Sequence, residues 1–196
     1  MIQMYYKTPF EEKIERLFSS KGIINPSELS IEYLSNVFNI QIVYISSTPE
    51  RAIWDNRMSV IFLDSTKSLP EMREIFFHEL AHPILHVGNQ LNMCSDFRNY
   101  QENQAKIFQL YAAIPFYMIK KLNFPSEDRL IIEQLSDTFI VTHQLAKKRW
   151  QQIKQRIYSA LYLRNTTTTP ISQPRRRSKE TQRALDKLYR QTGVRS

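Results

Sequence analysis

The pentapeptide His-Glu-Leu-Ala-His at residues 78–82 constrains the fold more than any other part of this sequence. It lies within a helical pattern that begins near Pro70, a residue suited to the first turn of a helix, and runs to about Val87. Residues four positions apart lie on one face of a helix, so the imidazoles of His78 and His82 can reach one metal ion. The three preceding residues are apolar. We therefore expect a long, largely buried helix that carries a metal site.

The pattern H-E-x-x-H also predicts the chemistry of that site. Two imidazoles suit zinc, and a catalytic zinc site has one further protein ligand and a position open for water. Glu79 lies about 100° around the helix from His78. Its carboxylate can therefore act on the water as a general base without binding the metal, and then pass the proton to the leaving amine. The motif predicts a Zn2+ site with Glu79 as the catalytic residue.

The third metal ligand must come from outside the motif. Ligands at positions i, i+4 and i+8 of one helix span about 12 Å, too far to meet one ion, so we expect His86 to line the cleft or to stand behind the ligands. The metzincin pattern needs a histidine at position 88, which is a glycine. Glu102, near the start of the next expected helix, is the better candidate for a His2Glu site. Its spacing from Asn99 also fits a helix N-terminal cap, so spacing leaves both roles open.

Glycine and cysteine are scarce, and this excludes several classes of site. The three glycines are too widely spaced for the glycine-rich loops that hold phosphate groups. The single cysteine, Cys94, excludes an internal disulfide and any paired-cysteine metal or redox site. No apolar run approaches the ~18 residues that span a bilayer, and the N-terminus lacks the features of a signal peptide. We expect a cytoplasmic protein without membrane association.

The net charge of +8 is concentrated at the C-terminal end of the sequence. Residues 164–196 contain nine basic and two acidic residues, whereas residues 1–163 are nearly neutral. Residues 164–178 are polar, basic and interrupted by proline, which is typical of a flexible linker. A basic tail of this kind is either a solvated appendage or a contact for nucleic acid or an acidic partner.

Hydrophobic periodicity predicts an α+β protein that is mostly helical. Three short β-branched or aromatic segments predict strands, and their short connections favour a small antiparallel sheet. Pro115 is expected to end or kink the helix that contains Glu102. The expected helices cover about residues 9–21, 25–39, 70–87, 99–121 and two or three segments within 127–160; the expected strands cover 40–45, 51–54 and 59–63.

Residues 135–150 predict a helix, a tight turn and a second helix capped by Thr142, a loose helix-turn-helix pattern. Such helix pairs are common packing units, and some of them bind DNA in a sequence-specific way. The sequence therefore divides into three expected parts. These are residues 1–122 with the H-E-x-x-H motif, a helical helix-turn-helix-like region at 123–163, and a basic flexible tail at 164–196.

Three runs together resemble the ImmA/IrrE family of metallopeptidases. Residues 77–86 read Phe-His-Glu-Leu-Ala-His-Pro-Ile-Leu-His, residues 101–108 read Gln-Glu-Asn-Gln-Ala-Lys-Ile-Phe, and residues 112–115 read Ala-Ala-Ile-Pro. They are similar to the family pattern HEL-x-H-x-x-LH, E-x-x-A-x-x-F and a helix that ends at a proline. The clear match covers about residues 58–118.

The resemblance implies a zincin-like fold for residues 1–122, with zinc held by His78, His82 and Glu102 and with Glu79 as the catalytic residue. It further implies that the substrate is a helix-turn-helix transcriptional repressor, whose cleavage derepresses a prophage, an integrative element or a stress regulon. One departure is Pro83, which directly follows the second histidine and is expected to kink or loosen the helix.

Two other functions share the same sequence features. The chain could be a non-catalytic module that binds a repressor or DNA through the helix pair and the basic tail, with a vestigial metal site. It could also be a toxin-like partner in a two-gene system. For the protease, we expect the substrate to pair as an added strand with the segment at 59–63.

Overall fold

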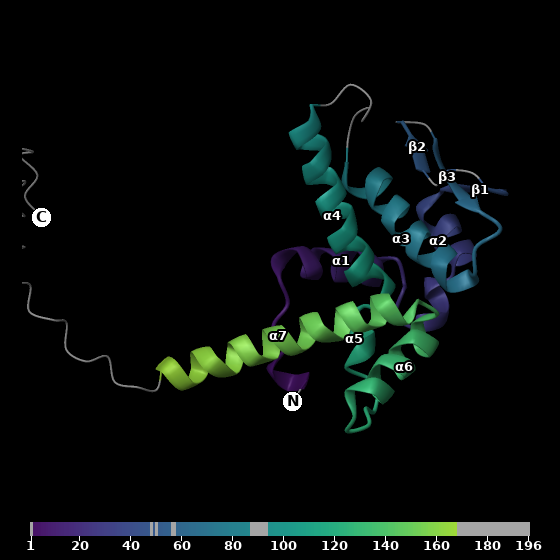
Figure 1. Ribbon diagram of the computed structural model, residues 1–196. Coiled ribbons are helices and arrows are strands. Elements are labelled where there is room, and N and C mark those ends of the chain that lie inside the picture. Colours follow the sequence, from purple (N-terminus) through teal and green to yellow (C-terminus); the bar gives the residue numbers. More distant parts are fainter. Residues whose placement is uncertain (1, 48, 50, 56–57, 87–93, 168–196) are drawn as a thin grey trace, which may run out of the picture. The chain divides into compact units, whose positions relative to one another are not determined.

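The computed structural model describes residues 2–167 except residues 48, 50, 56–57 and 87–93, and only the backbone of 165–167 (Figure 1). The described chain is mostly helical with one small sheet, which confirms the α+β class. The helices are η1 (Ile2–Met4), α1 (Pro9–Ser20), η2 (Pro26–Leu29), α2 (Ile31–Phe38), α3 (Leu69–Leu85), α4 (Ser95–Ala113), α5 (Phe116–Ile119), α6 (Asp128–Phe139) and α7 (His143–Thr167), and the strands are β1 (Gln41–Ile45), β2 (Arg51–Trp54) and β3 (Ser59–Asp64).

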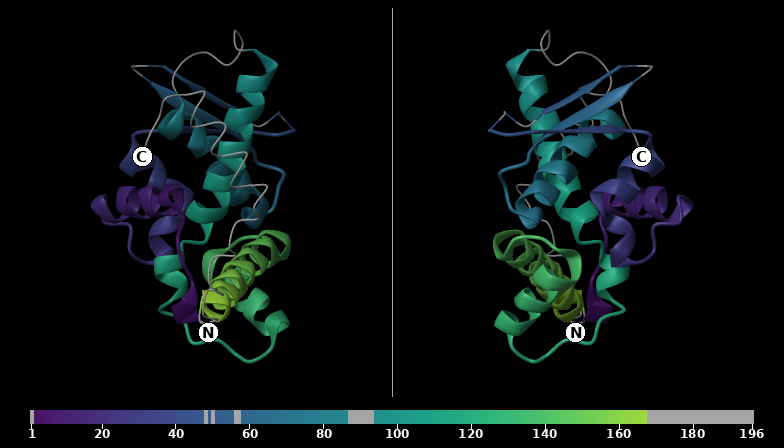
Figure 2. Two further views of the ribbon diagram at one scale, coloured as in Figure 1. Left: turned by 90° about the vertical axis from the view of Figure 1, so that its left-hand side faces the viewer. Right: turned by 90° about the vertical axis from the view of Figure 1, so that its right-hand side faces the viewer.

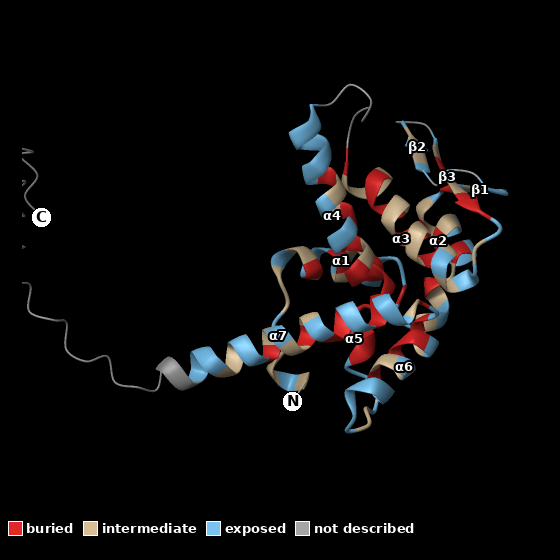
Figure 3. Cartoon of the chain, in the orientation of Figure 1, coloured by how far each residue is buried: buried red, intermediate tan, exposed pale blue. Residues whose placement is uncertain are grey.

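The chain divides after Tyr158, and residues Met1–Tyr158 form one compact unit. Within the first unit, the sheet and the α6–α7 pair lie at opposite ends, with α1, α3 and α4 between them (Figure 2). Buried residues concentrate where these helices face one another (Figure 3). Helix α3 is at the centre, because its apolar side chains at 76, 77, 80 and 81 are fully buried.

The sheet corrects the expectation of an antiparallel arrangement. Its strand order is β1-β3-β2, with β3 antiparallel to β2 but parallel to β1. Parallel neighbours need a crossover connection, and here β2 itself provides the return path, since the chain passes from β1 to the far edge and comes back as β3. Strand β3 is therefore central, with Ile61 and Leu63 fully buried. The free edges belong to β1 and β2, not to the segment at 59–63 expected to receive a substrate.

The expected helix at 25–39 is two shorter helices. Asn25 and Glu28 form a capping box that starts η2. Ser30 then adopts an extended conformation and caps α2, where its hydroxyl accepts a hydrogen bond from the Tyr33 amide at 3.1 Å. A second N-terminal cap inside one apolar pattern breaks the helix, because the Ser30 backbone leaves the helical region.

The α6–α7 pair confirms the expected helix, tight turn and capped second helix. Ile140 ends α6 in the left-handed conformation, and the Thr142 hydroxyl accepts from the Leu145 amide at 3.2 Å. The turn is held by α3. Buried Arg73 donates to the carbonyl oxygens of Phe139 and Ile140, both at 3.0 Å, and the carboxylate of Glu74 accepts from the Thr142 amide at 2.8 Å.

A buried ion-pair cluster joins α1 to α7. Glu11 and Arg149 are 3% and 0% exposed, and the Glu11 carboxylate pairs with Arg149 and Arg156. Burial alone would raise the pKa of Glu11, but Arg149 and a hydrogen bond from Tyr5 outweigh it and hold that pKa below its usual value. Tyr111 of α4 completes the cluster, with its ring 4.9 Å from the Arg149 guanidinium.

Several expectations concern residues near the C-terminus. The expected linker at 164–178 begins inside α7, which continues to Thr167, and the rest of that linker and of the tail lies outside the described residues. The boundary near residue 122 stays a prediction. In the part of the chain that is described, no helix is long and apolar enough to cross a membrane.

We predict that Glu11→Gln lowers the free energy of unfolding by about 3–5 kcal/mol, because it leaves the buried Arg149 and the half-buried Arg156 without a countercharge. Urea denaturation followed by circular dichroism measures this. The control is Glu12→Gln, because Glu12 pairs with Arg16 on the exposed face of the same helix, and its loss should change stability by less than about 0.5 kcal/mol. Equal losses in the two variants would contradict the role of the cluster.

Candidate metal centre

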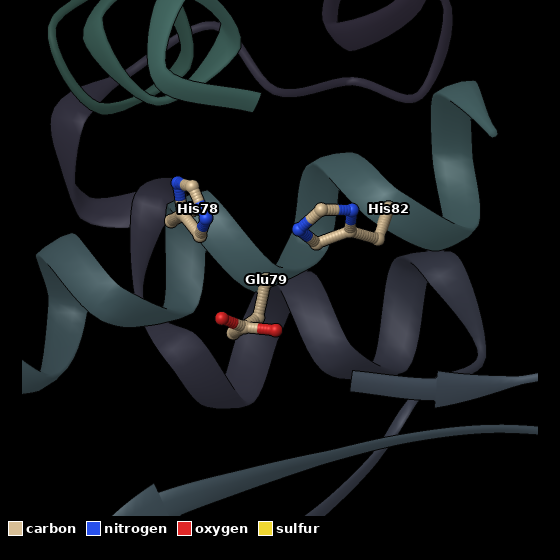
Figure 4. A group of neighbouring side chains, drawn as sticks. All are labelled: His78, Glu79 and His82. Atoms are coloured by element: carbon tan, nitrogen blue, oxygen red, sulfur yellow. The ribbon is translucent and has the colours of Figure 1, made fainter. Parts of the chain in front are cut away.

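Helix α3 presents the two motif histidines on one face. Ring nitrogens of His78 and His82 and a carboxylate oxygen of Glu79 all lie within 4.8 Å of one another. Figure 4 shows that Glu79 leaves the helix in a different direction from the imidazoles, toward the strands. This is the result of the 100° step between neighbouring helical residues. The arrangement leaves the imidazole face open to a group from another element.

Helix α4 supplies that group. The Glu102 carboxylate faces both histidines, with Oε2 at 3.2 Å from Nε2 of His78 and Oε1 at 3.7 Å from Nε2 of His82. The helix begins at Ser95, so Glu102 lies in its third turn. The alternative in which Asn99 and Glu102 form an N-terminal cap is therefore wrong, because the helix starts four residues earlier than expected.

Packing of α4 against α3 fixes the position of Glu102. Ala105 and Phe108 of α4 are fully buried. The Gln109 amide donates to the Glu74 carbonyl oxygen on α3 at 2.8 Å. Glu102 lies about one turn before this buried stripe and is partly exposed, whereas residues 95–100 at the N-terminal end of α4 are exposed. Figure 3 shows the change from exposed to buried residues along this helix.

The distances from the Glu102 carboxylate to the two histidines fit a metal site. In a tetrahedral zinc site with bonds of about 2.1 Å, ligand atoms lie about 3.4 Å apart. The separations of 3.2 and 3.7 Å between Glu102 and the two histidines are close to this value. Two imidazoles with one carboxylate form a donor set that zinc accepts, and three ligands leave one position for water.

Burial keeps His82 in the form that can bind a metal. His82 is 3% exposed, and burial lowers the pKa of its imidazole to about 4, although Glu102 acts in the opposite direction. At neutral pH the ring is therefore uncharged, and one of its two nitrogens carries no proton. The indole of Trp54 stacks on this ring with the centroids 5.5 Å apart.

His86 stands behind His82. Its Nδ1 lies 3.2 Å from Nδ1 of His82, and its Nε2 lies 3.3 Å from Oε1 of Gln104. The structure places the Tyr111 hydroxyl in the ion-pair cluster, where it accepts from Gln152 and Arg156, nine residues beyond Glu102 along α4.

Pro83 leaves α3 continuous. The helix extends two residues beyond it to Leu85, and the His86 amide donates to the His82 carbonyl at 2.9 Å. Proline removes only the hydrogen bond to the carbonyl of Glu79. Pro83 lies in the last turn of α3, so no further turns of the helix follow that a bend could displace.

Two residues near the histidines had no predicted role. Trp54 stacks on His82, and its Nε1 donates to the His86 carbonyl at 3.2 Å. Gln104 belongs to the run that carries the family resemblance, and its position two residues after Glu102 gave no sign of the contact with His86. Neither contact has a signature in local spacing, because each joins two separate elements.

The chain is similar in sequence to two proteins of one bacterium and in structure to a third protein. The chain is 27% identical to the phage-like element PBSX protein XkdA of Bacillus subtilis, over 77% of this chain and 76% of XkdA. It is also 27% identical to the uncharacterized protein YqaB of the same organism, over 79% of this chain and 92% of YqaB. A Mycobacterium tuberculosis transcriptional regulator aligns in structure with a TM-score of 0.49 and 16% identity, over 72% of this chain and 46% of the regulator.

The match to a protein family covers more than half of the sequence. Residues 36–151 match the peptidase family described as the IrrE N-terminal-like domain. This range contains the whole sheet, both histidines of the motif, Glu102 and the turn between α6 and α7. The chain belongs to the family of IrrE N-terminal-like peptidase domains.

Proposed function

We propose that the protein is a zinc-dependent endopeptidase, with the metal held by His78, His82 and Glu102. The observation that carries this proposal is the approach of one carboxylate, from a different helix, to the Nε2 atoms of both histidines. Within the described part of the chain, the basic groups that pair with this carboxylate are the two histidines. The proposal also agrees with the membership in a metallopeptidase family.

Glu79 is the general base in this proposal. Zinc in such a site supplies Lewis-acid activation of water and of a carbonyl group. The Glu79 carboxylate accepts a proton as the water oxygen attacks the carbonyl carbon of the peptide bond. It then delivers that proton to the amide nitrogen as the carbon–nitrogen bond breaks. Its direction, different from that of the imidazoles, suits a base that does not bind the metal (Figure 4).

We propose that the substrate pairs with β2 as an added strand. Strand β3 is paired on both sides, so the segment at 59–63 cannot accept the substrate as an added strand. Among the described strands, β2 pairs with β3 on one side only, and its last residue, Trp54, stacks on His82. Backbone groups along this edge can align an extended peptide beside the metal ligands.

A helix-turn-helix transcriptional repressor is the proposed substrate. Its support is the family resemblance together with a relative described as a protein of a phage-like element. Cleavage of the repressor would derepress a prophage, an integrative element or a stress regulon. Because such a repressor acts on DNA in the cytoplasm, we place the protease in the same compartment.

We predict that the wild-type protein binds one zinc ion per chain and that Glu102→Ala weakens zinc binding at least about tenfold. Elemental analysis after dialysis and competition with a chromogenic chelator measure the stoichiometry and the affinity. Glu79→Gln is the matched variant, because it removes a carboxylate from the same site and should retain zinc. Full retention of zinc by Glu102→Ala would exclude Glu102 as a ligand.

We predict that the zinc-loaded protein cleaves a helix-turn-helix repressor encoded beside it, and that Glu79→Gln reduces the rate by at least about 10²-fold. Gel electrophoresis and mass spectrometry of the products measure the cleavage and locate the bond. Tight binding of the repressor by wild type, without any cleavage, would instead support the non-catalytic module.

We predict that a non-cleavable substrate peptide slows amide hydrogen exchange in β2 but not in β1. The two strands are the two edges of one sheet, so β1 is an internal control for a general change in stability. Hydrogen–deuterium exchange with mass spectrometry measures both. Protection confined to β1, or no protection in either strand, would contradict pairing at β2.

A further inference from the structure

A chain of four polar side chains leads away from the candidate metal ligands. His82 contacts His86 through their Nδ1 atoms at 3.2 Å, and Nε2 of His86 contacts Oε1 of Gln104 at 3.3 Å. The Gln104 amide nitrogen donates to the Tyr100 hydroxyl at 2.8 Å. The chain thus crosses from the C-terminal end of α3 to α4 and ends at Tyr100, which is exposed.

The direction of each hydrogen bond follows from the Gln104 amide. Its nitrogen donates to Tyr100, so its carbonyl oxygen faces His86 and must accept. Nε2 of His86 is therefore a donor, and in a neutral ring its Nδ1 is then an acceptor. That acceptor requires a proton on Nδ1 of His82. Nε2 of His82, the nitrogen that faces Glu102 at 3.7 Å, then carries no proton.

The surroundings favour neutral, fixed rings at both positions. His82 and His86 are 3% and 6% exposed, and burial disfavours a charged imidazole. Trp54 stacks on His82 and donates to the backbone carbonyl of His86, so a residue of β2 holds both histidines in place. Neither histidine can rotate freely to exchange the roles of its two nitrogens.

We propose that His86, oriented by Gln104 and Tyr100, is a positioning residue that fixes His82 with its proton on Nδ1 and its Nε2 directed at the metal. This inference deepens the proposed function and rests on the assignment of His82 as a ligand. Groups that hold the second nitrogen of a metal-bound histidine set its ring orientation and its basicity, and their loss commonly weakens metal binding.

Two substitutions at His86 distinguish the effect of its hydrogen-bond acceptor from the effect of its size. In His86→Asn, Oδ1 takes the place of Nδ1 and still accepts from His82, whereas His86→Leu has the same branching but no acceptor. We expect zinc affinity to fall roughly 10- to 100-fold in His86→Leu and to stay within about threefold of wild type in His86→Asn. Chelator competition measures the affinities, and circular dichroism confirms folding. Equal affinities of wild type and His86→Leu would overturn the proposal.

The Gln104→Met variant tests the next contact without touching α3. It should place His82 in a mixture of its two neutral tautomers, because His86 loses its fixed acceptor. Asn103→Met is the control, since it introduces the same side chain at an exposed position of the same helix and should leave the His82 tautomer unchanged.

Ring nitrogen shifts measured by NMR on the metal-free protein report the tautomers directly. We expect the Nδ1–H form of His82 and the Nε2–H form of His86 in the wild type. A wild-type protein with the Nε2–H form of His82 would overturn the inference, whether or not the zinc site exists. A wild-type protein that has the expected tautomers but binds no zinc would instead contradict the proposed function.

Discussion

The contact between α3 and α4 is the interaction on which the rest of this structure depends. One apolar stripe on each helix is buried in it, and the Gln109 amide bonds to the backbone of α3. The same contact brings the Glu102 carboxylate to the open face of the two motif histidines. A change in the relative position of these helices by one residue, about 1.5 Å, would alter both separations that fit a metal ion.

Helix α3 links the candidate site to the other parts of the unit formed by residues 1–158. Near its start, Arg73 and Glu74 hold the turn between α6 and α7 through backbone groups. At its end, the carbonyl of His86 accepts from Trp54 of β2. A partner that displaced either neighbour would therefore act on the helix that carries His78 and His82. This physical connection does not depend on which substrate the proposed peptidase cleaves.

The helices and strands were largely predictable because they depend on local patterns. Periodicity located α1 and all three strands within one or two residues, and Pro115 ended α4 as expected. The predictions were wrong where a helix cap decides the length of a helix or where a pairing partner decides the direction of a strand. Ser30 divided an apolar pattern into two helices, and the parallel pairing of β1 with β3 depended on where β2 lies in the sheet. Strand direction is a relation between segments, so no single segment encodes it.

The sequence by itself determined that two imidazoles share a helix face with Glu79 beside them, because a spacing of four residues has one consequence in a helix. It named Glu102 but left open whether it is a ligand or a cap. Tertiary structure decided that α4 starts at Ser95 and that Glu102 faces both histidines. It also decided that Trp54 stacks on His82 and bonds to the backbone of His86, and that Gln104 contacts the His86 ring. These contacts join residues 18 to 32 positions apart, and only the packing of whole elements brings such residues together.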